Sequence, residues 1–137
     1  MNDSKRVVVG VDGSPESAKA VRWAADFADL TGADLLLVIA WQWPAMYGAP
    51  VRWPEFSPGN DARVVVEKAK ADLARAHGKV DVAVWEGRPG KVLVDEAEFA
   101  AVLVVGSQGH GAVAEAVLGS VSAYCVRHAH CPVVVVR

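Results

Sequence analysis

Five apolar runs recur along the chain, and segments with a helical spacing of apolar residues separate them. Four of the runs are nearly continuous stretches of valine, leucine, isoleucine and alanine, whereas the third alternates between apolar and polar residues. Continuous runs are typical of strands covered on both faces, and alternation is typical of a strand nearer the edge of a sheet. The predicted strands are residues 6–11, 34–41, 80–86, 102–105 and 133–137.

Four helices are predicted between these strands. Ser14 followed by Pro15 is a strong start signal, since a hydroxyl caps the helix and proline takes its first position, and Gly32 is a stop signal. The predicted helices run from Pro15 to about Leu30 and over about 60–76, 89–99 and 120–128, with Gly78 ending the second. The predicted apolar sides are Ala18, Val21, Trp23, Ala24, Phe27 and Ala28 in the first helix, and Val64, Val65, Ala69, Leu73 and Ala76 in the second.

The alternation of strands and helices predicts an α/β fold with one parallel sheet and helices on both faces. The chain has 137 residues, 53% of them hydrophobic, which suits a single domain spanning 1–137. A formal net charge of −2 and the lack of a basic run argue against binding to nucleic acid or an anionic membrane. No apolar stretch is long enough to cross a bilayer and no signal-peptide pattern opens the chain, so we expect a cytoplasmic protein.

The segment after the second predicted strand departs from this pattern. Residues 42–59 contain four prolines and several aromatic residues without periodicity. One interpretation is a surface excursion in which Trp43, Tyr47, Trp53 and Phe56 pack locally. The other is a lid over a ligand or a contact for a partner protein, for which residues 42–56 are the candidate.

A glycine pattern follows the fourth predicted strand. The apolar run 102–105 ends at Gly106, Gly109 and Gly111 follow, and Gly-Ser-Val-Ser at 119–122 precedes a helical segment, with the spacing G-x2-G-x9-G-S. Glycines let backbone amides approach a ligand, and the start of a helix offers free N–H groups and a positive dipole end. Two hydroxyls at the same place add donors. The pattern predicts a site for an anionic group such as a phosphate.

This pattern resembles the nucleotide-binding motif of the universal stress protein family. Val-Val-Val-Gly-Val-Asp-Gly-Ser at 7–14 is similar to the family's first strand and acidic turn, and His-Ala-His-Cys-Pro-Val-Val-Val-Val at 128–136 to its final helix-to-strand junction. The resemblance implies an open, doubly wound, five-stranded sheet of order 3-2-1-4-5, of the adenine-nucleotide alpha-hydrolase-like type. That order places the ligand between the first and fourth strands, which lead into Asp12 and Gly106.

The resemblance also implies a ligand, ATP with Mg²⁺ bridging its phosphates, and a role for each matching residue. Asp12 would hold the nucleoside, with the base between Gly10, Val11 and Ala40. The phosphates would lie against Gly106, Ser107, Gly109, His110, Gly111, Gly119, Ser120, Val121 and Ser122. Some relatives carry arginine where this chain has Gln108, which removes one cationic contact. The alternatives are that Asp12 only caps its turn and that the glycines only serve turns and helix packing.

The function predicted in this way is that of an ATP-binding universal stress protein, a nucleotide-dependent regulator of stress or dormancy with no assigned catalytic residue. A slow ATPase is one rival, although no lysine or arginine finger is found. A nucleotide-independent interaction module is another. A third is a zinc site or redox switch built from Cys125, His128, His130 and Cys131, against which we prefer two free thiols and no bound metal.

The last predicted strand suggests an assembly. It is apolar until Arg137 and lies at the edge of the sheet in the implied order. An apolar edge strand favours pairing with a second chain, and in many relatives this strand builds the dimer. We therefore predict a homodimer through Val133–Val136.

Overall fold

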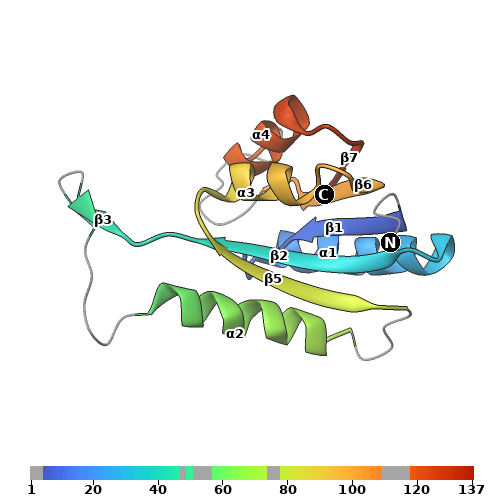
Figure 1. Cartoon of the computed structure of the whole chain (residues 1–137), viewed down its shortest axis with the longest axis horizontal. Helices are drawn as coiled ribbons and strands as arrows, with labels where there is room; N and C mark the ends of the chain where they lie inside the picture. The colour runs from blue at the N-terminus through green and yellow to red at the C-terminus, as the bar shows by residue number, and fades with distance from the viewer. Residues whose placement is uncertain (1–4, 47–48, 51–56, 74–77, 109–117) are drawn as a thin grey trace.

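The computed structural model describes residues 5–46, 49–50, 57–73, 78–108 and 118–137. Strands and helices alternate through most of this part of the chain (Figure 1). The strands are β1 (Arg6–Gly10), β2 (Asp34–Trp41), β3 (Ala45–Met46), β4 (Ala49–Pro50), β5 (Val80–Glu86), β6 (Val102–Gly106) and β7 (Val133–Val136). The helices are α1 (Pro15–Thr31), α2 (Pro58–Ala71), α3 (Pro89–Glu96) and α4 (Ser120–His128).

The main sheet has five parallel strands in the order β5-β2-β1-β6-β7. In terms of the five predicted strands this order is 3-2-1-4-5, so the predicted fold class and strand order are confirmed. β1 lies at the centre, where the chain leaves on one side toward β2 and later returns on the other toward β6. The carboxyl ends of β1 and β6 therefore flank the point at which the strand order reverses.

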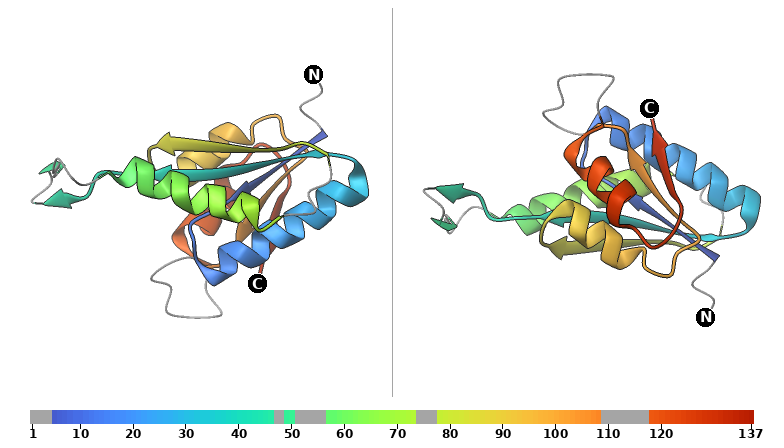
Figure 2. Two further views of the ribbon diagram at one scale, coloured as in Figure 1. Left: turned by 90° about the horizontal axis from the view of Figure 1, so that it is seen from below. Right: turned by 90° about the horizontal axis from the view of Figure 1, so that it is seen from above.

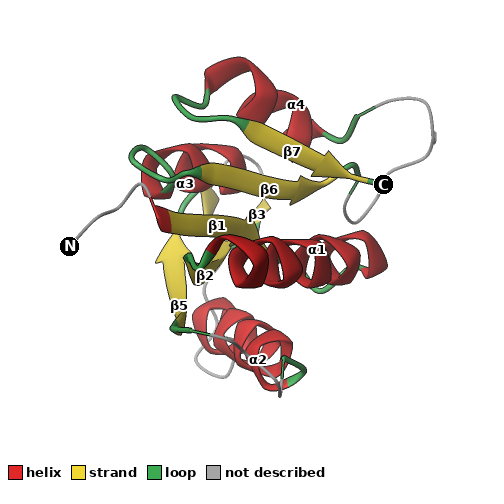
Figure 3. Ribbon diagram, turned by 90° about the vertical axis from the view of Figure 1, so that its right-hand side faces the viewer, coloured by secondary structure: helices red, strands yellow, loops and turns green. Residues whose placement is uncertain are grey.

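Two layers of helices cover the sheet, as Figure 3 shows. Helices α1 and α2 pack on one face, where Val7, Val9 and Leu37 lie in a single buried cluster. Helices α3 and α4 pack on the other face, where Val8 and Leu103 join a second cluster. Because side chains alternate along each strand, continuous apolar strands serve both clusters, as their sequence predicts.

Helix α1 begins and ends where its sequence signals predict. Ser14 caps the first turn, its hydroxyl accepting a hydrogen bond from the Ser17 N–H, and Gly32 closes the helix in the left-handed conformation with φ of 72°. The buried face differs in part from the prediction. Its residues are Ser17, Ala20, Val21, Ala24 and Ala28. Ala18 is exposed, and Trp23 is 37% exposed and stacks on Phe27 at the rim of the face.

Helix α2 is where the sequence prediction was least accurate. It starts at Pro58 behind the Ser57 cap and ends at Ala71, well before Gly78. Val66 is fully buried together with Ala62, whereas Val64, predicted on the apolar side, is 68% exposed. The apolar face is therefore turned relative to the prediction. Val65, Ala69 and Leu73 are partly buried against the core, and Ala76 lies outside the described residues.

The excursion after β2 contains a short antiparallel ladder that its sequence did not predict. β3 pairs with β4, and both lie beyond the end of the main sheet (Figure 2). Trp43 packs edge-on against Trp41 with ring centroids 5.8 Å apart, in line with local aromatic packing. Tyr47, Trp53 and Phe56 lie outside the described residues.

The second half of the chain follows its predicted order with small changes in length. α4 has its predicted bounds, whereas α3 stops at Glu96, three residues before the predicted end. β5 is an edge strand of half-exposed residues, as its alternation predicts. Within the described ranges, no helix is long and apolar enough to cross a membrane.

Candidate functional site

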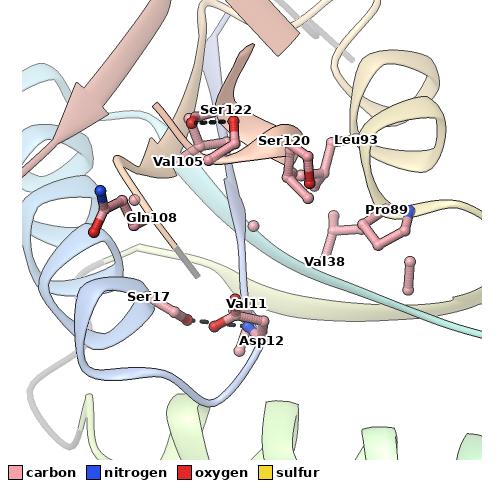
Figure 4. Close-up of a pocket in the computed structure, with 15 residues that line it drawn as sticks. Val11, Asp12, Ser17, Val38, Pro89, Leu93, Val105, Gln108, Ser120 and Ser122 are labelled. Carbon is pink, nitrogen blue, oxygen red and sulfur yellow. Dashed lines mark hydrogen bonds between the residues drawn. The ribbon is translucent and has the colours of Figure 1, made fainter. Parts of the chain in front are cut away.

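A cavity of about 490 Å³ opens at the carboxyl ends of β1, β2 and β6 (Figure 4). The ends of these strands and the first turns of α1, α3 and α4 form its wall. The residues that line it are Gly10, Val11, Asp12, Ser17, Val38, Ala40, Pro89, Leu93, Val105, Gly106, Gln108, Gly119, Ser120, Val121 and Ser122. The cavity thus lies at the reversal of strand order, where open parallel sheets bind ligands.

One side of the cavity is the turn between β1 and α1, which is closed by its own hydrogen bonds. The Ser14 N–H donates to Asp12 Oδ1 at 2.8 Å, and the Asp12 N–H donates to Ser17 Oγ at 3.1 Å. Gly13 adopts a φ of 82°, which favours glycine at this point of the turn. Asp12 therefore shapes the turn, as the structural alternative predicts, while its side chain is exposed and lines the cavity.

The opposite side is the start of α4, which is organised differently. Gly119 occupies the N-cap position, so no side chain caps this helix. The Ser107 carbonyl accepts hydrogen bonds from the Gly119 N–H at 2.7 Å and from Ser122 Oγ at 2.9 Å. Ser122 Oγ also lies 3.0 Å from the Gly119 carbonyl. These bonds hold the helix start against the end of β6.

The first turn of α4 consequently presents N–H groups that no side chain in the described part of the chain caps. N–H groups in the first turn of a helix have no carbonyl partner within the helix, and here the Ala123 N–H is the first to bond back, to the Gly119 carbonyl. The positive end of the helix dipole adds to their attraction for an anion. Ser120 is exposed and lines the cavity, so its hydroxyl joins these donors.

The third side is apolar. Val38 and Ala40 from β2 line this part of the cavity together with Pro89 and Leu93 from α3. Leu93 lies directly over β1, because a Cβ on Gly10 would come within 2.8 Å of its Cδ1 atom. The absence of a side chain at Gly10 therefore lets α3 settle on the sheet, and the cavity gains an apolar wall that suits a flat ring.

Gly106 has a different role from the one its position suggests. A Cβ at this residue would lie 3.0 Å from the carbonyl oxygen of Glu16 and 3.1 Å from its carbonyl carbon. The missing side chain thus makes room for the first turn of α1, on the sheet face that α1 and α2 cover. On the side where a Cβ would point, Gly106 therefore serves helix packing, as the alternative interpretation predicts. Its backbone still lines the cavity.

Most of the site residues predicted from the sequence meet in this cavity. Gly10, Val11, Asp12 and Ala40 line it with Gly106, and so do all four residues of 119–122. Ser107 does not line it and acts through its carbonyl, behind the helix start. Ser122 is 2% exposed, and its hydroxyl proton is directed at carbonyl oxygens. Gly109, His110 and Gly111 lie outside the described residues.

Six lining residues were missed by the site prediction, namely Ser17, Val38, Pro89, Leu93, Val105 and Gln108. Strand alternation could have found Val38, since it shares the strand face of Ala40 two residues later. No local signal marks Leu93, because only the packing of α3 on Gly10 brings it to the cavity.

The described lining contains a single ionisable side chain, that of Asp12, and no lysine or arginine. An anion at this end of the sheet would therefore be held by amides, hydroxyls and the α4 dipole, together with any cation that accompanies it.

The two cysteines, Cys125 and Cys131, are free thiols. Cys125 is buried and Cys131 partly buried, and burial raises the pKa of both thiols, that of Cys125 to about 11. His130 faces Glu98, with 4.0 Å between Nδ1 and Oε1, and His128 packs on Tyr124. Among the residues that the structure describes, no group of three or more histidine, cysteine or acidic side chains could hold a metal ion.

Comparison with known proteins identifies the family. The model of the universal stress protein family matches residues 3–137. The chain belongs to this family. The universal stress protein Rv2623 of Mycobacterium tuberculosis is 36% identical over 148 residues, which cover 99% of this chain and 48% of that protein. This universal stress protein chain thus spans about half the length of the curated relatives it matches.

Solved universal stress proteins share the whole fold. One, in complex with cAMP, has a TM-score of 0.74 and 29% identity, covering 97% of this chain and 96% of that one. Another, from Archaeoglobus fulgidus in complex with dAMP, has a TM-score of 0.73 at 21% identity, covering 96% and 97%. The five-stranded topology found here is therefore that of the universal stress protein fold.

Proposed function

We propose that this universal stress protein is a cytoplasmic, ATP-binding regulator whose nucleotide state is read out in stress or dormancy. The observation that carries the proposal is one cavity that joins an apolar wall to the uncapped start of α4. Such a cavity suits a ligand with a flat ring at one end and phosphates at the other. The cAMP complex of a universal stress protein 29% identical to this chain supports a nucleotide of this kind.

The base would lie against Val38, Ala40, Pro89 and Leu93. A ring that packs against apolar side chains is stabilised by about 25 cal/mol for each Å² of apolar area that it buries, and no charge is required. The backbone around Val11 is firmly held, since its N–H donates to the Val38 carbonyl at 2.8 Å and extends the ladder beyond β1. A rigid edge of this kind discriminates between bases better than a loop would.

The sugar would lie near Asp12 and Ser17. Asp12 uses Oδ1 for the Ser14 amide, and an exposed carboxylate retains further lone pairs for ribose hydroxyls. Ser17 Oγ accepts a hydrogen bond from the Asp12 N–H, and its hydroxyl would donate to a ligand oxygen. The phosphates would lie at the first turn of α4, against the amides of Ser120 and Val121.

The residues present fit a magnesium nucleotide. Asp12 is a hard oxygen donor, and no basic side chain balances a triphosphate in the described lining. Mg²⁺ would supply the missing positive charge by bridging the phosphates. Without a basic side chain in the described lining to stabilise phosphoryl transfer, we expect slow hydrolysis at most.

The proposal includes a homodimer through β7. This strand is at the edge of the sheet, and in the described part of the chain its ladder is with β6 alone. Its valines are partly buried, and a second copy of the same strand would complete the ladder and cover them.

Native mass spectrometry of the freshly purified protein tests the site and the assembly together. We expect a dimer with two additional masses that denaturation releases as ATP. Titration calorimetry of the emptied protein with ATP and Mg²⁺, and with ATP and a chelator, then measures the contribution of the cation. A bare dimer that ignores millimolar magnesium ATP would contradict nucleotide binding, and a monomer would contradict the assembly.

A variant that fills the apolar end of the cavity tests whether the base lies there, and a matched variant outside the cavity is its control. Ala40→Leu places extra methyl groups where the base would lie, and we expect affinity to fall by about tenfold or more, as overpacking costs about 1–3 kcal/mol. Ala123→Leu makes the same change at an exposed position outside the lining and should leave affinity unchanged. Gly106 is unsuitable for this test because its substitution disturbs the packing of α1.

A further inference from the structure

Helix α3 carries a glycine in its first turn at a place where alanine would suit a helix better. Gly90 is buried, and it is not among the glycines with positive φ. Glycine at a helical position costs about 0.5–1 kcal/mol relative to alanine when nothing else intervenes. The backbone conformation therefore does not explain a glycine here, and a close neighbour must.

That neighbour is Tyr124 of α4. A Cβ on Gly90 would lie 2.7 Å from Cδ1 of Tyr124, 2.8 Å from Cγ and 3.0 Å from Cβ. These atoms are at the root of the tyrosine side chain, so a rotation of the ring cannot remove all three contacts. The ring also packs against His128, with centroids 4.3 Å apart. A methyl group at position 90 would consequently push the two helices apart.

The two helices that meet at this contact form opposite parts of the cavity wall. Pro89 and Leu93 flank Gly90 on α3 and line the apolar side, whereas Ser120 and Val121 begin α4 and line the polar side. α3 and α4 pack directly against each other. The separation of the helices at Gly90 and Tyr124 is therefore also the separation of the base wall from the phosphate end.

We propose that Gly90 and Tyr124 are a spacing pair, a contact that sets the separation of α3 and α4 and thereby the fit of the cavity to its nucleotide. Gly90 does not line the cavity, so it is a positioning residue that acts through Pro89 and Leu93. This inference rests on the proposed function for its effect on affinity. The separation of the helices can be tested without any ligand.

The test is a cycle of Gly90→Ala, Tyr124→Ala and the double variant, titrated with magnesium ATP and with AMP. Overpacking of 1–3 kcal/mol at the contact predicts that Gly90→Ala weakens binding by about tenfold. Tyr124→Ala removes the ring, and because the structure around a truncated side chain relaxes only in part, the helices should move little and affinity should stay within about twofold of the parent. The double variant should recover most of the loss, because Cδ1 and Cγ are gone and only the Cβ contact at 3.0 Å remains.

A control variant distinguishes the effect of helix position on affinity from the effect of a less stable fold. Val66→Ala in α2 removes buried methyl groups from a helix that contributes nothing to the described lining. We expect it to lower the unfolding temperature while affinity stays at the parent value. Equal affinities of Gly90→Ala and the parent would overturn the spacing pair, as would a double variant that binds as weakly as Gly90→Ala.

Methyl NMR of the unliganded protein tests independently whether the separation of α3 and α4 changes. Gly90→Ala should shift the resonances of Leu93 and Val121 on the two sides of the cavity, and the double variant should return them toward the parent. If the parent binds neither nucleotide, the proposed function is wrong, and these resonances still decide the spacing pair. Unchanged resonances in Gly90→Ala would overturn it.

Discussion

The starts of α1 and α4 occupy equivalent places and are built in opposite ways. Each follows one of the two adjacent parallel strands at the reversal of strand order, β1 and β6. The start of α1 is closed by side chains, since Ser14 caps Ser17 and Asp12 accepts the Ser14 N–H. The start of α4 has Gly119 at its cap, and among the described residues no side chain accepts a hydrogen bond from its first amides.

The difference shows that two helix starts at the same edge of the sheet can serve different purposes, one the stability of the fold and the other the binding of a ligand. A serine cap is worth about 0.5–2 kcal/mol, which α1 gains and α4 forgoes. The amides that α4 leaves open are the ones that can meet a phosphate. α4 is instead held from behind, through the Ser107 carbonyl and the hydroxyl of Ser122. Different atoms thus stabilise the start of α4 and offer hydrogen bonds to a ligand.

The largest expected effect comes from giving α4 the kind of start that α1 has. Gly119→Asp places a carboxylate where it caps the first amides and repels phosphates. Gly119 has extended backbone, with φ of −67° and ψ of 165°, which an aspartate adopts readily. Like charges brought together cost several kcal/mol, so affinity for magnesium ATP should fall by about a hundredfold or more in a calorimetric titration.

Gly119→Asn is the matched variant, since it caps the helix without adding charge. It should lose less affinity than Gly119→Asp, and both should unfold at or above the parent temperature. Parent-like affinity in Gly119→Asp would show that the start of α4 does not face the phosphates.

A smaller effect is expected from removing the support behind α4. Ser122→Ala deletes a buried hydroxyl that bonds to the Ser107 carbonyl, and the loss should be about 1–2 kcal/mol in the free energy of unfolding. Because the helix start is then less firmly held, nucleotide affinity should fall as well. Urea denaturation and titration measure the two effects.

Ser14→Ala is the control for this comparison. It removes the cap of α1 and should lower the free energy of unfolding by about 1 kcal/mol with little change in affinity. If Ser14→Ala lowers affinity as much as Ser122→Ala does, the contrast between the two helix starts is incorrect.

The smallest effect is predicted for Ser120→Ala. This hydroxyl is exposed and lines the cavity, so we expect it to donate a hydrogen bond to the ligand and to contribute little to the stability of the fold. Loss of one neutral hydrogen bond should weaken binding by about threefold to tenfold and leave the unfolding temperature unchanged. A fall in stability without a change in affinity would reverse the roles assigned to Ser120 and Ser122.

How far the sequence predicts this protein depends on whether a feature is local. The five strands and the Ser14 and Gly32 signals were predicted because each depends on neighbouring residues. The buried face of α2 was only partly predicted because its three valines, 64–66, are consecutive and point to different sides of the helix, and packing on β2 and β5 selects Val66 over Val64. A helix with apolar residues on several sides does not specify its own rotation.

The candidate site likewise has a part that the sequence predicts and a part that it does not. The sequence by itself determined the alternating elements of a parallel sheet and, through its resemblance to the family, the order of the strands and the two segments, around Asp12 and around 119–122, that meet at the reversal point. Only the tertiary structure decided what surrounds them. Leu93 closes the apolar side over Gly10, Gly106 makes room for Glu16, and Ser122 supports α4 from behind. Each of these depends on the approach of segments distant in the chain, which close packing settles and no local pattern encodes.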